Sequence, residues 1–250
     1  MREKMDRSQL FGITESSEVA FNLDIFERLY DGNIIITKRL TNKLIDKLIE
    51  YKEHIILHLT VTGHGGSKLE PFVPVVDTTH KKLGLLLDRG FPVEQCVLRI
   101  DPIIPTDEGI VKACNVIELF KGYGIKRVRI SILDMYPHVK ERFIESGIEL
   151  PFDTFHAPLS LREDIVRKIK ELGDEYGFEV ETCGEPGIDS IPCLSQKDVD
   201  ILGLTDKITL VGSAEQRSNC KCPQNKQELI QNKEYKAKRC SSACLYCFWK

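Results

Sequence analysis

The regular alternation of apolar segments and segments with helical spacing constrains the fold of this chain most strongly. Residues 33–38 form a continuous apolar run, which is typical of a strand buried on both faces. Residues 41–52 then place Leu44 and Leu48 at helical spacing, and a second strand-like run follows at residues 54–62. A strand, a helix and another strand in succession indicate a parallel sheet.

The same alternation extends over most of the chain. Strands are predicted at residues 10–14, 33–38, 54–62, 96–101, 127–133, 178–182 and 207–211. Helices are predicted at residues 21–30, 41–52, 79–89, 109–123, 138–146 and 161–176. We therefore expect an α/β fold of about six to seven mainly parallel strands, forming either an open sheet or a full or partial (β/α) barrel.

Polar residues at the ends of successive predicted strands favour the barrel. Such residues are Thr14, Glu15, Thr37, Lys38, Thr60, Thr62, Asp101, Asp134 and Glu181. In barrels the carboxyl ends of the strands form the rim at which active sites are built. The alternative is that these residues are helix caps and loop residues. A length of 250 residues suits one domain, with a barrel body at residues 1–212 and a cysteine-rich segment at residues 213–250 completing it.

Charge and hydropathy narrow the range of partners. The formal net charge is -3, so binding of bulk nucleic acid would need a local basic patch. No apolar run reaches the ~18–20 residues of a membrane span, and the first ten residues lack the apolar core of a signal peptide. We expect a cytoplasmic protein with no membrane partner.

Seven of the nine cysteines lie in the last third of the sequence. Cys96 and Cys114 fall in apolar segments and are interpreted as buried thiols. The others are Cys183, Cys193, Cys220, Cys222, Cys240, Cys244 and Cys247. An odd number of clustered cysteines in a chain without an export signal favours metal binding over disulfides.

The last three cysteines, Cys240, Cys244 and Cys247 (the terminal triplet), have the spacing C-x3-C-x2-C. Three thiolates can bind three irons of a cubane cluster and leave the fourth iron open. A structural zinc site needs four ligands, so the alternative is a zinc knuckle completed by another cysteine. Hydrophobic Leu245, Phe248 and Trp249 would shield a cluster from water.

With Tyr246, the terminal triplet resembles the cluster loop of radical S-adenosylmethionine enzymes. The branch of spore photoproduct lyase and the DNA-repair-photolyase-like proteins is similar in two further regions. They are Ile34-Ile-Ile-Thr-Lys38, leading to Thr60-Val-Thr62 and Leu69-Glu70-Pro71, and the run Arg99-Ile-Asp101-Pro102-Ile-Ile-Pro105. The resemblance covers about residues 10–135 and the last ten residues.

The resemblance implies a [4Fe–4S] cluster on the terminal triplet that binds S-adenosyl-L-methionine and yields a 5'-deoxyadenosyl radical. That radical would abstract hydrogen from a small-molecule or nucleic-acid substrate. A reductant such as a flavodoxin or ferredoxin would supply the electron.

The relatives carry the cluster loop near their N-terminus, so the resemblance also implies a circular permutation. Residues 10–14 would take the place of the relatives' second strand, and Lys250 would lie near Leu10. The chain also resembles an uncharacterised bacterial family with the same succession of cysteines and a Gln-Arg pair like Gln216-Arg217.

The resemblance also points to residues that would bind the cofactor. Gly12-Ile-Thr14-Glu15 stands where the relatives hold the methionyl amine. Arg99, Asp101 and Ser131 suit the carboxylate or the ribose hydroxyls, and Lys38 is a further candidate for the carboxylate. Thr14 and Thr60 complete the set as rim residues. The alternative for each of these residues is a structural ion pair inside the barrel mouth.

Cys183, Cys193, Cys220 and Cys222 (the cysteine quartet) are numerous enough for a second site. We expect an auxiliary iron–sulfur cluster or a zinc ion there, because the C-x-C pair does not fit a simple zinc ribbon. The alternatives are free thiols, or one thiol that donates a hydrogen atom. Two other functional classes stay open for the whole chain: a non-catalytic metal-stabilised binding module and a zinc-dependent hydrolase.

Overall fold

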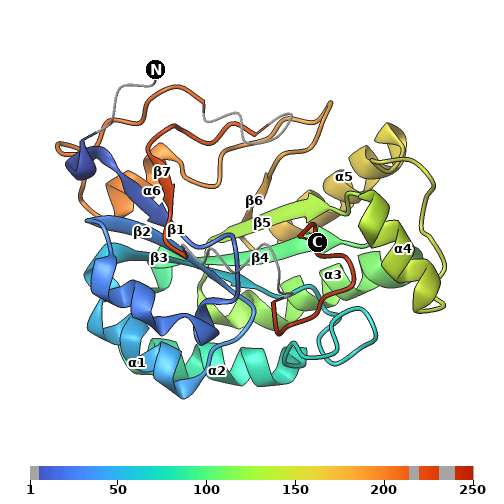
Figure 1. Cartoon of the computed structure of the whole chain (residues 1–250), viewed down its shortest axis with the longest axis horizontal. Helices are drawn as coiled ribbons and strands as arrows, with labels where there is room; N and C mark the ends of the chain where they lie inside the picture. Colours follow the sequence, from blue (N-terminus) through green and yellow to red (C-terminus); the bar gives the residue numbers. More distant parts are fainter. Residues whose placement is uncertain (1–5, 214–219, 231–239, 250) are drawn as a thin grey trace.

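The computed structural model describes residues 6–213, 220–230 and 240–249. Its centre is a seven-stranded sheet in the order β6-β5-β4-β3-β2-β1-β7, in which every pairing is parallel (Figure 1). The strands are β1 (Phe11–Ile13), β2 (Gly32–Thr37), β3 (Ile55–Thr60), β4 (Cys96–Ile103), β5 (Arg127–Ile132), β6 (Glu179–Thr182) and β7 (Lys226–Glu228). The helices are α1 (Asn42–Glu50), α2 (Val76–Asp88), α3 (Asp107–Phe120), α4 (Pro137–Glu145), α5 (Leu159–Glu175) and α6 (Gln196–Ile201).

The strands β1 to β6 lie side by side in the order of the chain. Only β7 departs from this order, because it comes from the cysteine-rich segment and pairs with β1 at the edge of the sheet. Among the described residues, β6 and β7 each pair with a single strand, so the sheet is open. The predicted α/β class and parallel sheet are confirmed, and the open sheet is compatible with a partial barrel.

The two faces of the sheet are covered differently. One face packs against helices, as Ile35, Leu57 and Leu98 join a core with residues of α1, α2, α3 and α5. On the other face, Ile34, Ile56 and Val97 form a core with apolar residues from the segments after β6, namely Cys183, Cys193, Leu194, Val199, Ile208 and Cys222. Successive side chains of a strand point to opposite faces, so continuous apolar runs are needed where both faces are covered. This second face carries the site.

Side-chain caps fix where several helices begin. The Thr41 hydroxyl accepts the N–H of Leu44 at the start of α1, and Thr106 accepts that of Gly109 at the start of α3. Ser195 and Asp198 form a reciprocal capping box at α6. Each such cap satisfies backbone donors that the first turn leaves without partners.

The structure corrects three sequence predictions. Residues 207–211 are not a strand, because side chains of Gln9 and Asn225 accept two of their backbone N–H groups and β7 occupies the edge of the sheet. Residues 21–30 form short 3-10 helices, interrupted at Asn22, instead of an α-helix. The strand predicted at residues 96–101 is longer, because β4 continues through Pro102 to Ile103 across a register shift in its pairing with β5. The helix α6 and the strand β7 were not predicted.

Two predictions fall on residues outside the described ranges, namely the proximity of Lys250 to Leu10 and the Gln216-Arg217 pair. The described part of the chain contains no helix with the length and apolar character needed to cross a membrane.

Candidate functional site

A cavity of about 570 Å³ lies at the carboxyl ends of the strands, between the sheet, the cysteine-rich segments and residues 240–249 (the terminal loop). It is lined by all of the cofactor-binding candidates, namely Thr14, Glu15, Lys38, Thr60, Arg99, Asp101 and Ser131. The same cavity is lined by the terminal triplet and by the cysteine quartet. The structure therefore brings every site residue predicted from the sequence to one place.

The two-residue period of the strands explains why the cavity wall is polar. On β4, Val97 packs in the apolar part of this face, and the next two residues on the same side are Arg99 and Asp101. On β5, Arg129 and Ser131 are likewise two residues apart and lie on the same face of the sheet. On the cavity face of β4, the side chains are therefore apolar toward the amino end of the strand and polar at its carboxyl end.

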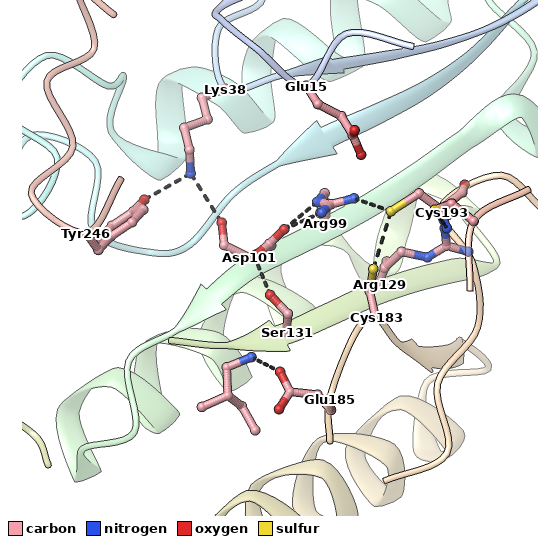
Figure 2. A network of polar contacts seen from close by, with 12 residues as sticks. Glu15, Lys38, Arg99, Asp101, Arg129, Ser131, Cys183, Glu185, Cys193 and Tyr246 are labelled. Carbon is pink, nitrogen blue, oxygen red and sulfur yellow. Dashed lines mark hydrogen bonds and ion pairs between the residues drawn. The ribbon is translucent and has the colours of Figure 1, made fainter. Parts of the chain in front are cut away.

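Asp101 joins the polar residues of the cavity floor (Figure 2). Its carboxylate accepts Arg99 Nε at 2.7 Å and also the hydroxyl of Ser131. The backbone carbonyl of Asp101 lies 3.4 Å from Lys38 Nζ. These residues thus contact one another, as the alternative of a structural ion pair requires, and they also line the cavity. Their role in cofactor binding stays a prediction.

Contacts among Lys38, Glu70 and Tyr246 attach the terminal loop to the sheet. Lys38 Nζ lies 2.9 Å from Glu70 Oε1 and 2.9 Å from the Tyr246 hydroxyl, and that hydroxyl also donates to Glu70. The other Glu70 oxygen accepts the hydroxyl of Thr62 at 2.7 Å. Glu70 is 1% exposed, so its charge depends on these partners. Lys38 therefore holds the loop that carries the terminal triplet.

The loop is also held by its backbone. Arg142 of α4 donates to the carbonyls of Cys247 and Trp249, at 2.7 Å in each case. The N–H of Leu245 donates to the carbonyl of Leu69 at 2.9 Å. Loop residues 244–247 pack with Leu133, Val139 and neighbouring apolar side chains. The terminal loop is thus fixed at both its side chains and its backbone.

Within this loop Cys244 is buried, and Cys240 and Cys247 are partly buried. Burial raises the pKa of Cys244 to about 12 and also raises the pKa of Cys247. Metal ligation requires thiolates, so a cation at this position would have to displace these protons.

The sulfurs of the quartet converge on the opposite part of the cavity wall. The Sγ atoms of Cys183 and Cys193 lie 3.3 Å apart, and Cys222 Sγ accepts the N–H of Cys193 at 3.3 Å. Arg99 Nη1 is 3.6 Å from Cys193 Sγ. A chain of polar contacts therefore runs from Tyr246 in the terminal loop to Cys183 (Figure 2).

In the described residues, no three His, Cys, Asp or Glu side chains are arranged to hold a single metal ion. A cubane cluster makes a different demand, because each cysteine binds a different iron and the sulfurs lie farther apart. Three thiols on one anchored loop that line a cavity, two of them packed among apolar side chains, fit such a donor set. The ligand role of the terminal triplet and of the quartet stays a prediction.

The structure also reveals residues that sequence reasoning did not assign to the site. Lys226 of β7 is buried and binds Glu15 at 2.8 Å, while burial raises the pKa of that carboxyl group. Arg129 donates to the carbonyls of Pro192 and Cys193, at 2.8 Å each. The alternation of charged and apolar residues over 127–131 was the available signal for Arg129. Lys226 lies in a segment with no recognisable periodicity.

Two histidines of the strand β3 and the loop after it do not contribute to the cavity. His58 is fully buried, and neither of its ring nitrogens has a hydrogen-bond partner among the described residues. Burial lowers the pKa of His58 well below the usual value, which favours the neutral ring. His64 is buried and does not line the cavity.

The sequence of the chain matches a family described as a domain of unknown function, DUF1848, over residues 24–249. The chain belongs to the DUF1848 family. No curated protein matches it. The match spans β2 to β7 of this DUF1848 protein together with all seven cavity cysteines, so the family domain includes the terminal loop and every strand of the described sheet except β1.

The pair of Lys38 and Glu70 predicts a pH dependence of stability. Burial opposes ionisation of Glu70, but the charge of Lys38 and the hydroxyl donors outweigh it and lower the pKa of Glu70 below 4.5. The stabilisation is therefore fully present above about pH 4.5 and is lost as the pH falls through the lower folded-state pKa. We expect the difference in unfolding free energy between the unmodified protein and Glu70→Gln to be constant from pH 5 to 7 and to shrink below this range. Urea titrations at a series of pH values measure it, and a difference that grows on acidification would contradict the assignment.

Proposed function

We propose that this protein is a radical S-adenosylmethionine enzyme whose [4Fe–4S] cluster is held by Cys240, Cys244 and Cys247. One observation carries the proposal. The terminal triplet comes after all seven described strands in the sequence, yet its three cysteines line the same cavity as Arg99, Asp101 and Ser131. A loop that served only to fix the chain end would not need to present three thiols to that cavity.

When bound, the cluster and S-adenosylmethionine supply reductive cleavage of the sulfonium and a 5'-deoxyadenosyl radical. The residues of this chain bind, orient and shield. Arg99 and Asp101 offer a guanidinium and a carboxylate that suit the cofactor's carboxylate and ribose hydroxyls. Phe248 and Trp249 line the cavity beside Cys247 and exclude water from it. Lys38 and Tyr246 fix the position of the loop.

A circular permutation accounts for the order of these parts. The strand β7 is the last described strand before the terminal loop. It pairs with β1, which is the place that the relatives' first strand would take beside their second. Permutation leaves packed contacts unchanged and moves only the position of the chain ends. The parallel pairing of β7 with β1 supports this part of the proposal.

The size of the cavity favours a small molecule among the two predicted substrate classes. Its volume of about 570 Å³ lies within the ~300–1,000 Å³ that is usual for small-molecule sites. A flavodoxin or ferredoxin remains the proposed reductant.

Anaerobic reconstitution tests the proposal. We expect about four irons per chain and absorbance at about 400 nm. Addition of dithionite and S-adenosylmethionine should then yield 5'-deoxyadenosine. The variant Cys244→Ala should lose the product because a cluster ligand is missing. The matched variant Cys114→Ala should retain it, since Cys114 lies on α3 and does not line the cavity.

Three results would contradict this proposal in different ways. The absence of both iron and product in the unmodified protein would remove the enzyme assignment. Unchanged product in Cys244→Ala would refute the role of the terminal triplet. Zinc without iron in elemental analysis would favour a metal-stabilised binding module or a zinc-dependent hydrolase.

A further inference from the structure

Two cysteines of the quartet touch each other on the cavity wall, away from the terminal loop. Cys183 directly follows β6, and Cys193 lies in the segment before α6. Their Sγ atoms are 3.3 Å apart, and both side chains are buried but line the cavity. A disulfide bond requires an S–S distance of about 2.05 Å, so the two Sγ atoms would have to approach each other by about 1.2 Å.

The surroundings hold Cys193 firmly in this position. Arg129 binds its carbonyl oxygen and that of Pro192, and Cys222 Sγ accepts its N–H. Arg99 Nη1 approaches its sulfur at 3.6 Å. A guanidinium beside a sulfur atom favours the thiolate, which is the nucleophilic form of cysteine.

The contact distance argues against a single zinc ion between these two sulfurs. Sulfurs that are each about 2.3 Å from a tetrahedral zinc lie about 3.8 Å apart. The observed separation of 3.3 Å is shorter and is that of two sulfurs in direct hydrogen-bonded contact. This distance favours the free-thiol alternative for Cys183 and Cys193 over a shared ion.

We propose that Cys183 and Cys193 are a reversible dithiol/disulfide pair that reacts with small disulfides in the cavity. The Cys193 thiolate attacks one sulfur of the incoming disulfide, whose S–S bond breaks and releases one thiolate, which takes up a proton. Cys183 then loses its proton and attacks Cys193 Sγ, which releases the second half of the small disulfide. Two protein thiols and one disulfide thus become one protein disulfide and two small thiols.

This inference does not depend on the proposed function, because it uses neither the terminal triplet nor S-adenosylmethionine. The variant Cys244→Ala should therefore retain the thiol chemistry even though it lacks the proposed cluster. Failure of one proposal leaves the other standing.

Oxidation by glutathione disulfide tests the pair. The full-length protein is reduced under anaerobic conditions, freed of reductant, treated with glutathione disulfide, alkylated and mapped by mass spectrometry. We expect a Cys183–Cys193 disulfide that dithiothreitol reverses. Cys183→Ser should accumulate glutathione on Cys193. Cys193→Ser should lower the initial rate of glutathione release at least about tenfold, because the thiolate nucleophile is missing. Cys114→Ser is the matched control and should behave like the unmodified protein.

Mapping of the unmodified protein keeps the test independent of whether each variant folds. A disulfide from Cys193 to Cys222, or no disulfide at all, would overturn the proposal. Glutathione on Cys183 in Cys193→Ser at an undiminished rate would also overturn it. The proposal would also be overturned if the purified protein contained iron or zinc and the cysteine quartet could be alkylated only after a chelator had removed that metal.

Discussion

Replacing Asp198 by asparagine is expected to lower the free energy of unfolding by about 3–5 kcal/mol. Asp198 is fully buried, and its carboxylate lies 2.7 Å from Arg127 Nη1. Arg127 is itself only 2% exposed, and its remaining carboxylate neighbour, Glu181, is 3.9 Å away. The variant would leave a buried guanidinium without its close partner. The effect matters for the site, because this ion pair fastens α6, and with it Cys193, to the sheet.

Urea unfolding followed by circular dichroism measures this change. The neighbouring variant Lys197→Ala is the matched control, since Lys197 sits on the same helix and its partner Glu179 is also exposed. Exposed pairs contribute about 0–1 kcal/mol, so the control should change little. Equal losses in the two variants would show that the buried pair does not anchor α6.

The second large effect concerns Lys38. Lys38→Met should destabilise the folded protein by about 3–5 kcal/mol, because the carboxylate of Glu70 would stay buried without its cation. The loss should appear first in the terminal loop, which Lys38 contacts through Tyr246. Trp249, the single tryptophan of the chain, lies in this loop and provides a local signal. We expect its emission to become accessible to a soluble quencher at a lower urea concentration than that at which the sheet unfolds.

Two further variants isolate the cause. Lys47→Met removes an exposed lysine that pairs with Glu50 on α1, and it should leave both signals nearly unchanged. The double variant K38M/E70Q should recover much of the loss, because a neutral amide can still accept the hydroxyls of Thr62 and Tyr246. If the double variant is no more stable than Lys38→Met, the uncompensated charge is not the reason for the destabilisation.

The fold and the membership of the site were predictable from short-range patterns. Continuous apolar runs such as residues 33–38 identified strands covered on both faces, and polar residues at their ends identified the cavity wall. Parallel strands bring these ends to one edge, so Lys38, Arg99 and Ser131 could be placed together without any knowledge of distances.

What could not be predicted depends on contacts between distant residues. Residues 207–211 have an apolar pattern suited to a strand, but side chains of Gln9 and Asn225 satisfy their backbone instead. The strand β7 has the sequence Lys-Gln-Glu, which carries no hydrophobic period, and it is set by pairing with β1. The partnership of Lys38 with Glu70 could not be read from a spacing of 32 residues.

The position of β7 after the other six strands has a consequence for biosynthesis. A ribosome releases β1 to β6 first, and the terminal loop can dock only on a sheet whose earlier strands have already emerged. Translation that stops before residue 240 would leave the cavity without the terminal triplet. Iron loading by the proposed ligands Cys240, Cys244 and Cys247 would therefore be confined to chains whose synthesis has passed the whole sheet.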